Sequence, residues 1–477
     1  MRYRHIEILQ RYVMADSQYD VIVVGSGPGG CVTAIRASQL GFKTAIVEKA
    51  ELGGVCLNWG CIPTKALLRS AEVYSNMKHA SDYGLTASPG FDLQAIVKRS
   101  RNIAGQLSKG ISFLMRKNKV DVISGMASFE AGEPAPIVKV GSDSYSAKHV
   151  ILATGARART IPQAGLEPDG KFIWTAREAM VPEAMPKKLL VIGSGAIGME
   201  FASFYNAFGA DVTVVEMVDR ILPAEDSEIS DFAHKAFTQQ GMTIKTEAQV
   251  KSIAKNQNDV SVTISKDGQD EVLTVDRIIL AIGIVGNTED MGLEALGVKI
   301  DRTHIEVDEY SFTGVQGLYA IGDVTTPPWL AHKASHEGII CIEKIAGHDP
   351  HPLDANSIPG CTYCHPQIAS VGYTEAQAKA AGFDIKVGRF PFIGNGKAIA
   401  LGEAEGLIKT VFDVATGELL GAHMIGAEVT ELIQGYTIAR TLETTEQELM
   451  ETVFPHPTLS EMMHEAVLDA YDRTVHI

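Results

Sequence analysis

One pattern of strand, glycine-rich turn, helix and strand occurs twice in this 477-residue chain. Residues 19–48 begin with an apolar run, continue through G-x-G-x-x-G and end on an acidic residue. Residues 188–216 repeat the pattern, with each glycine of the motif and the terminal glutamate 168 residues further on. Two complete copies in one register predict two dinucleotide-binding units of the Rossmann type.

The glycines and the terminal glutamates are the candidate binding residues of the two repeats. The first glycine permits a tight turn, the second lets the backbone approach a pyrophosphate, and the third lets helix and strand pack closely. The glutamate can accept a hydrogen bond from a ribose hydroxyl. These positions are Gly25, Gly27, Gly30 and Glu48 in the first repeat, and Gly193, Gly195, Gly198 and Glu216 in the second.

The residues around Glu216 favour NAD over NADP in the second repeat. A carboxylate at this position repels a 2′-phosphate, and residues 217–219 contain no arginine. Arg220 is the one residue nearby that argues for NADP.

Three further strand ends supply candidate ligands. Open α/β sheets bind ligands at the carboxyl ends of their strands, and a buried aspartate there needs a partner such as a cofactor hydroxyl. We therefore expect contacts to the first dinucleotide from Thr154 and Gly155, which follow HVILA, and from Gly322 and Asp323, which follow GLYAI. Gly283, in DRIILAIGI, is expected on the side of the second dinucleotide.

The stretch GGVCLNWGCIPTK, residues 53–65, predicts a redox pair. Four residues separate Cys56 from Cys61, and one loose turn can supply the Cα separation of about 4.4–6.8 Å that a disulfide needs. Pro63 suits the first turn of a helix, so the thiols would lie at its positive end, where the pKa of a thiol falls. A structural bridge or half a zinc site is the alternative, although no second Cys or His pair stands at ligand spacing nearby, and we predict no metal site.

Charge and cysteine content limit the partners and the compartment. The net charge of −16 disfavours nucleic acid and anionic membrane surfaces, and no apolar run approaches the roughly 20 residues of a membrane span. Six cysteines in so long a chain favour a reducing compartment. We expect the cytoplasm for a bacterial-type protein, or an organellar matrix or stroma for a eukaryotic one. Residues 1–13 make a poor targeting signal, and Met14 is a candidate start.

From about residue 351 the pattern changes to short alternating strands and helices, which predicts a separate α+β domain. Near its end His456 lies between Pro455 and Pro457 and cannot be in a helix interior. A histidine oriented by Glu461 would suit general base catalysis. Thr458 and Glu461 also form a capping box, which would use Glu461 only to start the last helix. Both interpretations are open on these residues alone.

Two other patterns are interpreted as structural. Cys361, Cys364 and His365 spell the haem-attachment pattern C-x-x-C-H, but they precede an apparent edge strand and no cytochrome context follows. We interpret Cys361 and Cys364, like Cys31 and Cys341, as ordinary thiols. The helix expected over residues 92–117 carries a basic face, which we interpret as solvated surface.

Together these motifs closely resemble those of the flavin-dependent disulfide oxidoreductases, from about residue 19 to the end of the chain. The resemblance implies FAD in the first repeat, NAD in the second, and a homodimer. Within that family the chain is most similar to the members that oxidise protein-bound dihydrolipoamide with NAD. Their implied partner is a lipoyl-bearing protein of a 2-oxo acid dehydrogenase complex or of the glycine cleavage system.

Other members of the family fit less well. Glutathione and trypanothione reductases use NADP, and the C-terminal DRTVHI lacks the cysteines of mercuric and C-terminal-thiol thioredoxin reductases. A non-catalytic subunit that retains FAD only structurally is the alternative from another class of function.

The resemblance also implies roles for the site residues. Cys56 exchanges with the substrate and Cys61 faces the flavin. His456 is the base, acting with Glu461, and it reaches the active site of the other subunit. Trp59 departs from the family, which usually has a smaller residue at this position.

Three more residues match family positions near the flavin. Lys65 and Glu200 match an ion pair beside the reactive nitrogen, and Asp323 matches a contact to the ribityl chain. On their own, Lys65 could equally be an exposed helix residue and Glu200 a first-turn acid that complements the helix dipole.

We therefore expect an α/β protein with two Rossmann-like dinucleotide-binding domains and a C-terminal α+β dimerisation domain. The expected parts are an extension that can be disordered (1–18), an FAD-binding domain with the redox disulfide (19–155), an NAD-binding domain (156–283), a central domain that completes the FAD site (284–350) and an interface domain (351–477).

Overall fold

The computed structural model describes residues 18–476. The predicted N-terminal extension and the candidate start at Met14 lie outside the described residues, except for Gln18. The chain divides into two compact units. Unit 1 contains residues up to 54, 109–155 and 286–352, and unit 2 contains 55–108, 156–285 and 353 onward. Within the described chain, no helix is both long and apolar enough to cross a bilayer.

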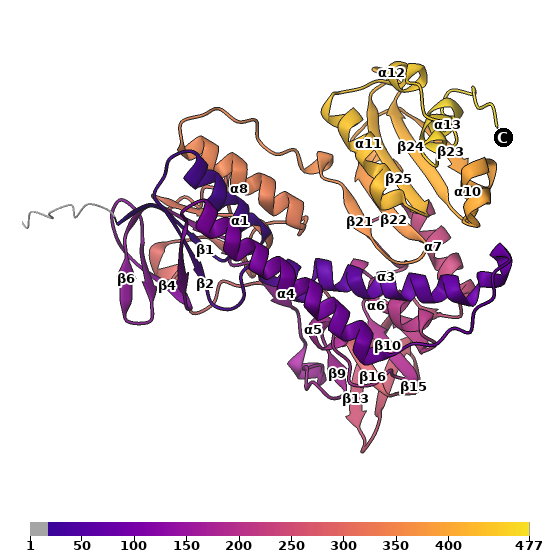
Figure 1. The fold of residues 1–477 in the computed structure, drawn as a ribbon, viewed down its shortest axis with the longest axis horizontal. Coiled ribbons are helices and arrows are strands. Elements are labelled where there is room, and N and C mark those ends of the chain that lie inside the picture. Colours follow the sequence, from indigo (N-terminus) through magenta and orange to yellow (C-terminus); the bar gives the residue numbers. More distant parts are fainter. Residues whose placement is uncertain (1–17, 477) are drawn as a thin grey trace, which may run out of the picture. The chain divides into compact units, whose positions relative to one another are not determined.

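Unit 1 is built on a five-stranded parallel sheet (Figure 1). Its interior strands are buried and apolar, as expected for a parallel sheet covered on both faces. Helix α1 (Pro28–Gln39) follows the first strand and packs beside α8 (Ala331–Ile345). The strand order is β20 (Leu318–Ala320), β7 (Ala147–Leu152), β1 (Tyr19–Val24), β2 (Thr44–Glu48) and β3 (Asp121–Ser124).

A small antiparallel sheet shares the core of unit 1. Phe129 and Val138 from this sheet pack in one apolar cluster with Ile22 and Leu152 from the parallel sheet. Its strands are β4 (Ala127–Glu130), β5 (Ile137–Val140) and β6 (Asp143–Tyr145).

Unit 2 contains the second repeat and a second five-stranded parallel sheet. Helix α6 (Ala196–Ala207) begins and ends 168 residues after α1, so the sequence repeat is a structural repeat. Helix α7 (Ser227–Gln239) follows the next strand. The strand order is β12 (Thr243–Lys245), β11 (Asp211–Val215), β10 (Lys188–Ile192), β16 (Arg277–Leu280) and β9 (Ile173–Trp174); β13 (Ala248–Lys255), β14 (Val260–Lys266) and β15 (Gln269–Val275) form an antiparallel sheet.

The redox segment forms two consecutive helices, α2 (Gly54–Trp59) and α3 (Cys61–Lys78). Leu67 and Ala71 of α3 lie in the apolar core that also contains Met199 and Phe201 of α6, and the two helices lie side by side. The helix predicted to have Pro63 in its first turn is confirmed, and it begins at Cys61.

The predicted helix over 92–117 is observed as α4 (Leu93–Lys117). The side chains of Arg99 and Arg101 donate hydrogen bonds to the carbonyl oxygens of Ala66 and Asn58. The interpretation of the whole basic face as solvated surface is therefore incomplete, because exposed Arg99 and half-buried Arg101 also bind the redox segment.

The C-terminal part of unit 2 is an antiparallel sheet with helices α11 (Val429–Thr441), α12 (Glu446–Glu451) and α13 (Glu461–Asp469) packed around it. The predicted mixture of short strands and helices is confirmed. The C-x-x-C-H stretch does not precede the edge strand as expected, because β21, which contains Cys361, is itself an edge strand of the sheet. The order is β21 (Gly360–Thr362), β22 (Gln367–Gly372), β25 (Leu419–Gly426), β24 (Leu407–Asp413) and β23 (Ile385–Pro391).

A buried charge cluster ties α7 to this sheet. Lys409 of β24 is 2% exposed, and its Nζ lies 2.8 Å from Asp226, 3.0 Å from Glu228 and 2.8 Å from Glu375. Asp226 is also the N-cap of α7, accepting from the backbone N–H of Glu228. One ammonium group therefore compensates carboxylates from two elements, and a buried charge of this kind is costly to leave unpaired.

Replacing Lys409 with Met should lower the free energy of unfolding by about 3–5 kcal/mol, because buried Asp226 would lose its partner. Denaturant unfolding of the FAD-containing protein measures this loss. Lys251→Met, which removes an exposed ion pair to Asp270, is the matched control and should leave the transition nearly unchanged. A Lys409→Met protein as stable as the parent would show that the cluster contributes nothing net.

Candidate functional site

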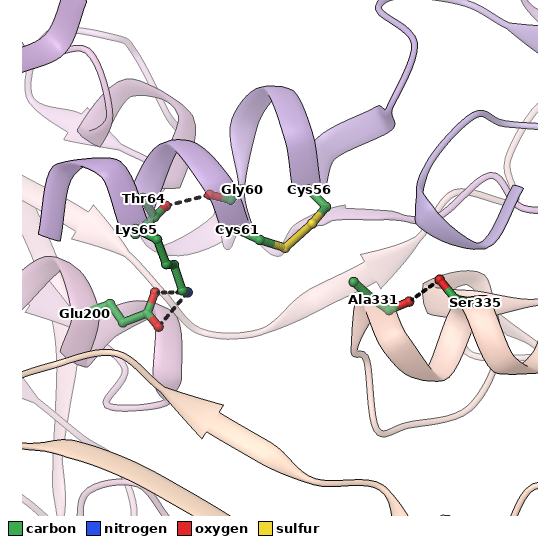
Figure 2. Close-up of a disulfide and its surroundings, with 8 residues drawn as sticks. All are labelled: Cys56, Gly60, Cys61, Thr64, Lys65, Glu200, Ala331 and Ser335. Carbon is green, nitrogen blue, oxygen red and sulfur yellow. Dashed lines mark hydrogen bonds and ion pairs between the residues drawn. A yellow bond between two sulfur atoms is a disulfide. The ribbon is translucent and has the colours of Figure 1, made fainter. Parts of the chain in front are cut away.

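Cys56 and Cys61 are joined by a disulfide with a Cα–Cα distance of 4.7 Å (Figure 2). Cys61 is the first residue of α3, and Pro63 lies in its first turn as predicted. The sulfur of Cys61 is therefore carried at the N-terminus of an 18-residue helix, where the partial positive charge of the dipole stabilises a thiolate. With both thiols bonded to each other, the half zinc site does not describe this state.

Lys65 of α3 and Glu200 of α6 form an ion pair (Figure 2). Nζ of Lys65 lies 2.8 and 2.9 Å from the two carboxylate oxygens of Glu200, whose side chain is buried. Lys65 follows Cys61 by four residues and so lies one turn further along α3. The structure thus brings together the two residues that the family resemblance pairs. Lys65 is not an isolated exposed residue, and Glu200 does not lie in the first turn of α6, so the alternative considered for each is wrong.

Tyr363 contacts both members of this pair and was not foreseen from the sequence. Its backbone N–H donates to Oε1 of Glu200 at 3.0 Å, and Nζ of Lys65 lies 4.5 Å from the centroid of its ring. The C-x-x-C-H segment therefore contacts the ion pair through Tyr363, and these contacts do not involve its two thiols. The only sequence signal was the unusual motif itself.

The three glycines of the first G-x-G-x-x-G motif, the first fingerprint, differ in how close their neighbours lie. A Cβ on Gly25 would lie 2.2 Å from the carbonyl oxygen of Ala153, and one on Gly30 would lie 1.9 Å from that of Gly25. These two positions need glycine for internal packing. A Cβ on Gly27 would meet nothing within 4 Å, so no packing within the chain requires glycine there, and the open space suits the approach of a pyrophosphate.

The second fingerprint repeats this division. Cβ atoms on Gly193 and Gly198 would lie 2.3 and 2.1 Å from backbone oxygens, whereas one on Gly195 would meet nothing within 4 Å. Gly27 and Gly195 are also the N-cap residues of α1 and α6. Both helix starts therefore present free N–H groups beside an open position, which is the arrangement a dinucleotide phosphate requires.

Glu48 ends β2 as predicted, and Glu216 directly follows the last residue of β11. Each glutamate binds a serine of its own turn. Oε2 of Glu48 accepts from the backbone N–H and the hydroxyl of Ser26, and Oε2 of Glu216 accepts in the same way from Ser194. The two serines also lie 168 residues apart, which is the signal that could have revealed them.

The two glutamates differ in their remaining capacity to accept hydrogen bonds. Oε1 of Glu48 accepts one backbone N–H, from Ala50, whereas Oε1 of Glu216 accepts two, from Met217 and Val218. A carboxylate offers about four acceptor positions, so Glu48 keeps one for a ribose hydroxyl. At Glu216 a hydroxyl has to share or displace a backbone donor. Arg220 forms an ion pair with neighbouring Asp219 at 3.3 Å.

Thr154 and Gly155 lie at the carboxyl end of β7. Thr154 exchanges two hydrogen bonds of 2.9 Å with Asn287, and the backbone N–H of Asn287 donates to Gly155. Gly155 and Gly283 both have positive φ and open surroundings, and the carbonyl of Gly283 accepts from Arg159 in unit 2.

Gly322 and Asp323 follow the carboxyl end of β20, an edge strand of the parallel sheet of unit 1. The backbone N–H of Gly322 donates to Glu337 of α8, which is itself paired with buried Lys333 at 2.6 Å. Burial raises the pKa of Asp323, although the charge of Lys333 opposes the shift. A carboxylate made costly by desolvation gains from a polar ligand, in accord with the predicted contact to a cofactor hydroxyl.

His456 and Glu461 are hydrogen-bonded, with Nδ1 of the ring 3.0 Å from Oε1 of the carboxylate. The other oxygen of Glu461 accepts from the backbone N–H of Thr458 at 2.9 Å. One oxygen of Glu461 therefore orients the His456 ring, and the other binds the backbone just before α13. The capping box is only half formed, because α13 begins at Glu461 with Ser460 as its N-cap and the hydroxyl of Thr458 bonds to Pro455 and Ser460.

The pKa of Glu461 lies below its usual range. Burial raises it, but the Thr458 N–H and His456 lower it by more. The ionised carboxylate therefore stabilises the folded state at neutral pH, and this contribution is lost as the pH falls through and below the usual carboxyl range. The imidazole of His456 is 81% exposed and available to another molecule.

The other four cysteines have the properties expected of ordinary thiols. Burial raises the pKa of Cys31 to about 12 and that of Cys361 to about 11. It raises the pKa of Cys341 and Cys364 as well. Such thiols carry little thiolate at neutral pH and are poor nucleophiles.

Two family models match this chain. Residues 19–338 match the pyridine nucleotide-disulphide oxidoreductases, and residues 358–467 match the dimerisation domain of the same family. The protein therefore belongs to the pyridine nucleotide-disulphide oxidoreductase family, which confirms the resemblance and the fold class predicted from the sequence.

Two relatives that match nearly the whole chain share one name. A dihydrolipoyl dehydrogenase of Rhizobium etli is 56% identical, and one of Zymomonas mobilis is 55% identical; each match covers 97% of this chain and 100% of the relative. Among solved structures, LpdA from Mycobacterium tuberculosis has a TM-score of 0.88 at 28% identity and covers 94% of this chain and 99% of that one.

Gly195→Ala should weaken NADH binding by about tenfold or more, which is about 1.4 kcal/mol, because the added methyl fills the open position beside the start of α6. Titration of the FAD-containing protein with NADH measures the dissociation constant. Gly105→Ala, at an equally open glycine of α4, is the matched control and should bind NADH like the parent. Unchanged affinity in Gly195→Ala would refute this placement of the pyrophosphate.

Proposed function

We propose that this protein oxidises protein-bound dihydrolipoamide to lipoamide and reduces NAD to NADH. The single observation that carries the proposal is the Cys56–Cys61 disulfide at the start of α3, with the Lys65–Glu200 pair one turn further on. Full-length identity of 56% to a dihydrolipoyl dehydrogenase supports the choice of substrate. The reaction converts two substrate thiols and NAD⁺ into a disulfide, NADH and one proton.

The proposal gives the two cysteines different roles. A substrate thiolate attacks Cys56, the mixed disulfide forms, and Cys61 leaves as a thiolate that the helix N-terminus stabilises. The second substrate thiolate then displaces Cys56, so the substrate leaves as a disulfide and the enzyme keeps the electron pair as two thiols. Stabilisation of its thiolate by the helix N-terminus makes Cys61 the better leaving group.

His456 is proposed as the base that ionises the substrate thiols. Its Nδ1–H donates to Glu461, which fixes the tautomer and leaves Nε2 free to accept a proton. The ionised Glu461 then stabilises the imidazolium that forms. By the family pattern, His456 serves the active site of the partner subunit in a homodimer, and the match of residues 358–467 to a dimerisation domain supports this.

FAD and NAD are the proposed cofactors, and the residues of both fingerprints fit a dinucleotide. Gly27 with Glu48 would hold FAD together with Thr154, Gly155, Gly322 and Asp323; Gly195 with Glu216 and Gly283 would hold NAD. When bound, FAD would supply the electron transfer that connects the Cys56–Cys61 dithiol to NAD. Lys65, held by Glu200, supplies a positive charge on α3, one turn after Cys61.

We also propose the wider context. The domain boundaries expected at residues 155, 283 and 350 separate an FAD domain, an NAD domain, a central domain and an interface domain. The partner is a lipoyl-bearing protein of a 2-oxo acid dehydrogenase or glycine cleavage complex. The acidic charge and few cysteines favour a reducing compartment such as the bacterial cytoplasm.

Activity with dihydrolipoamide against NAD and NADP tests the function directly. NADH formation with a strong preference for NAD supports it and eliminates a subunit that keeps FAD only for structure. A preference for NADP, or turnover of glutathione in place of lipoamide, would move the protein to another branch of the family.

Cys56→Ser should abolish lipoamide turnover while leaving FAD bound, because the disulfide that accepts the electron pair cannot form. Steady-state NADH production and the flavin absorbance of the purified variant measure the two effects. Cys361→Ser changes a thiol whose pKa is raised to about 11 and should keep normal activity. Full turnover in Cys56→Ser would remove this residue from the mechanism.

His456→Gln should lower turnover by about a hundredfold or more, the usual contribution of a general base. Raising the pH should recover part of the loss, since more of the substrate thiol is then ionised without help. His348→Gln, at an exposed histidine, serves as the control. A variant at position 456 with parental turnover and pH profile would leave Glu461 with only its role at the start of α13.

A further inference from the structure

The loop that closes the disulfide is held by side chains from two other helices. Trp59, the last residue of α2, is half-buried, and the guanidinium carbon of Arg101 in α4 lies 3.9 Å from the centroid of its ring. The guanidinium carbon of Arg177, in the short helix α5 (Ala176–Ala179), lies 4.2 Å from the same centroid. Both cations are well within the distance of about 6 Å at which the ring attracts them.

Helix α4 also binds the backbone on both sides of the disulfide. Three consecutive side chains of α4 donate hydrogen bonds to three carbonyl groups of the redox segment: Arg99 to Ala66 at 2.8 Å, Ser100 to Pro63 at 2.9 Å, and Arg101 to Asn58. Asn58 and Ser100 are buried, so water competes poorly for these bonds. The redox segment is thus fixed before and after Cys61.

The backbone of Arg177 is fixed at the start of α5. The side chain of Thr175 caps the start of α5, and Glu178 returns the bond in a complete capping box. Trp59 therefore connects the redox loop to two supports, α4 and α5, through one flat ring. A residue without an aromatic ring at position 59 would offer neither guanidinium group a π face.

We propose that Trp59, with Arg101 and Arg177, is a positioning residue that keeps Cys56 and Cys61 ready to re-form their disulfide. This deepens the proposed function, because it rests on reversible exchange at these two cysteines. Reduction adds two electrons and two protons and removes the covalent link. Contacts outside the pair must then keep the sulfurs close.

The redox potential of the pair is the quantity that such positioning changes. Contacts at residues 58 and 59 restrict the four residues between the cysteines, so the effective concentration of one thiol at the other stays high in the reduced protein. A high effective concentration favours the disulfide and makes the potential more negative. Contacts that only stabilise the fold equally in both redox states would not change it.

The test equilibrates the FAD-containing protein with mixtures of reduced and oxidised dithiothreitol. Thiol content is measured by alkylation and mass spectrometry, and flavin absorbance in the same samples reports the flavin state. Trp59→Leu should make the disulfide about tenfold easier to reduce, a shift of about 30 mV to less negative potential. Trp59→Phe, which retains an aromatic face, should recover most of the shift.

Two arginine variants complete the design. Arg101→Lys keeps the charge but loses the planar group over the ring, and should shift the equilibrium in the same direction as Trp59→Leu. It also carries the test if Trp59→Leu does not fold. Arg116→Lys, at an exposed arginine of the same helix, is the matched control and should behave like the parent.

The outcomes separate this inference from the proposed function. A parent protein whose Cys56–Cys61 disulfide cannot be reduced and re-formed would refute the function itself. The positioning role alone would be overturned by a different result. In that result the parent disulfide is reversible, and the equilibrium constants of Trp59→Leu and Arg101→Lys with dithiothreitol are both within twofold of the parent value.

Discussion

The start of helix α3 at Cys61 is the constraint on which the candidate site depends. It places one sulfur of the disulfide at the positive end of an 18-residue helix and puts Lys65 one turn further along, where it meets buried Glu200. The helix can begin there because Pro63 needs no N–H partner in a first turn. The same few residues therefore set thiol reactivity, the position of the positive charge and the packing of α3 on α6.

Much of the fold could be predicted because its signals are local in the sequence. The glycine fingerprints, the apolar strands and the redox spacing each lie within about one supersecondary unit, and the constant offset of 168 residues marks the two repeats as equivalent. The repeat extends further than the motif suggested, since α1 and α6 begin and end at that offset and Ser26 and Ser194 bind their glutamates alike.

The contacts that complete the site could not be predicted in this way, because they join residues far apart in the sequence. Tyr363 reaches Glu200 across 163 residues, and the arginines of α4 and α5 reach Trp59 from separate helices. No periodicity or spacing specifies such pairs, which depend on how helices pack. For the same reason the basic face of α4 looked like solvated surface, although two of its arginines bind the redox segment.

The central claim of the proposed function is that the two cysteines have unequal roles, Cys56 exchanging with the substrate and Cys61, at the start of α3, serving the flavin. Alkylation of the reduced, FAD-containing protein with a limiting amount of iodoacetamide, followed by peptide mass spectrometry, tests this most directly. The account predicts that Cys56 is labelled first and that Cys61 remains largely unmodified. Preferential labelling of Cys61 would contradict it and reverse the two roles.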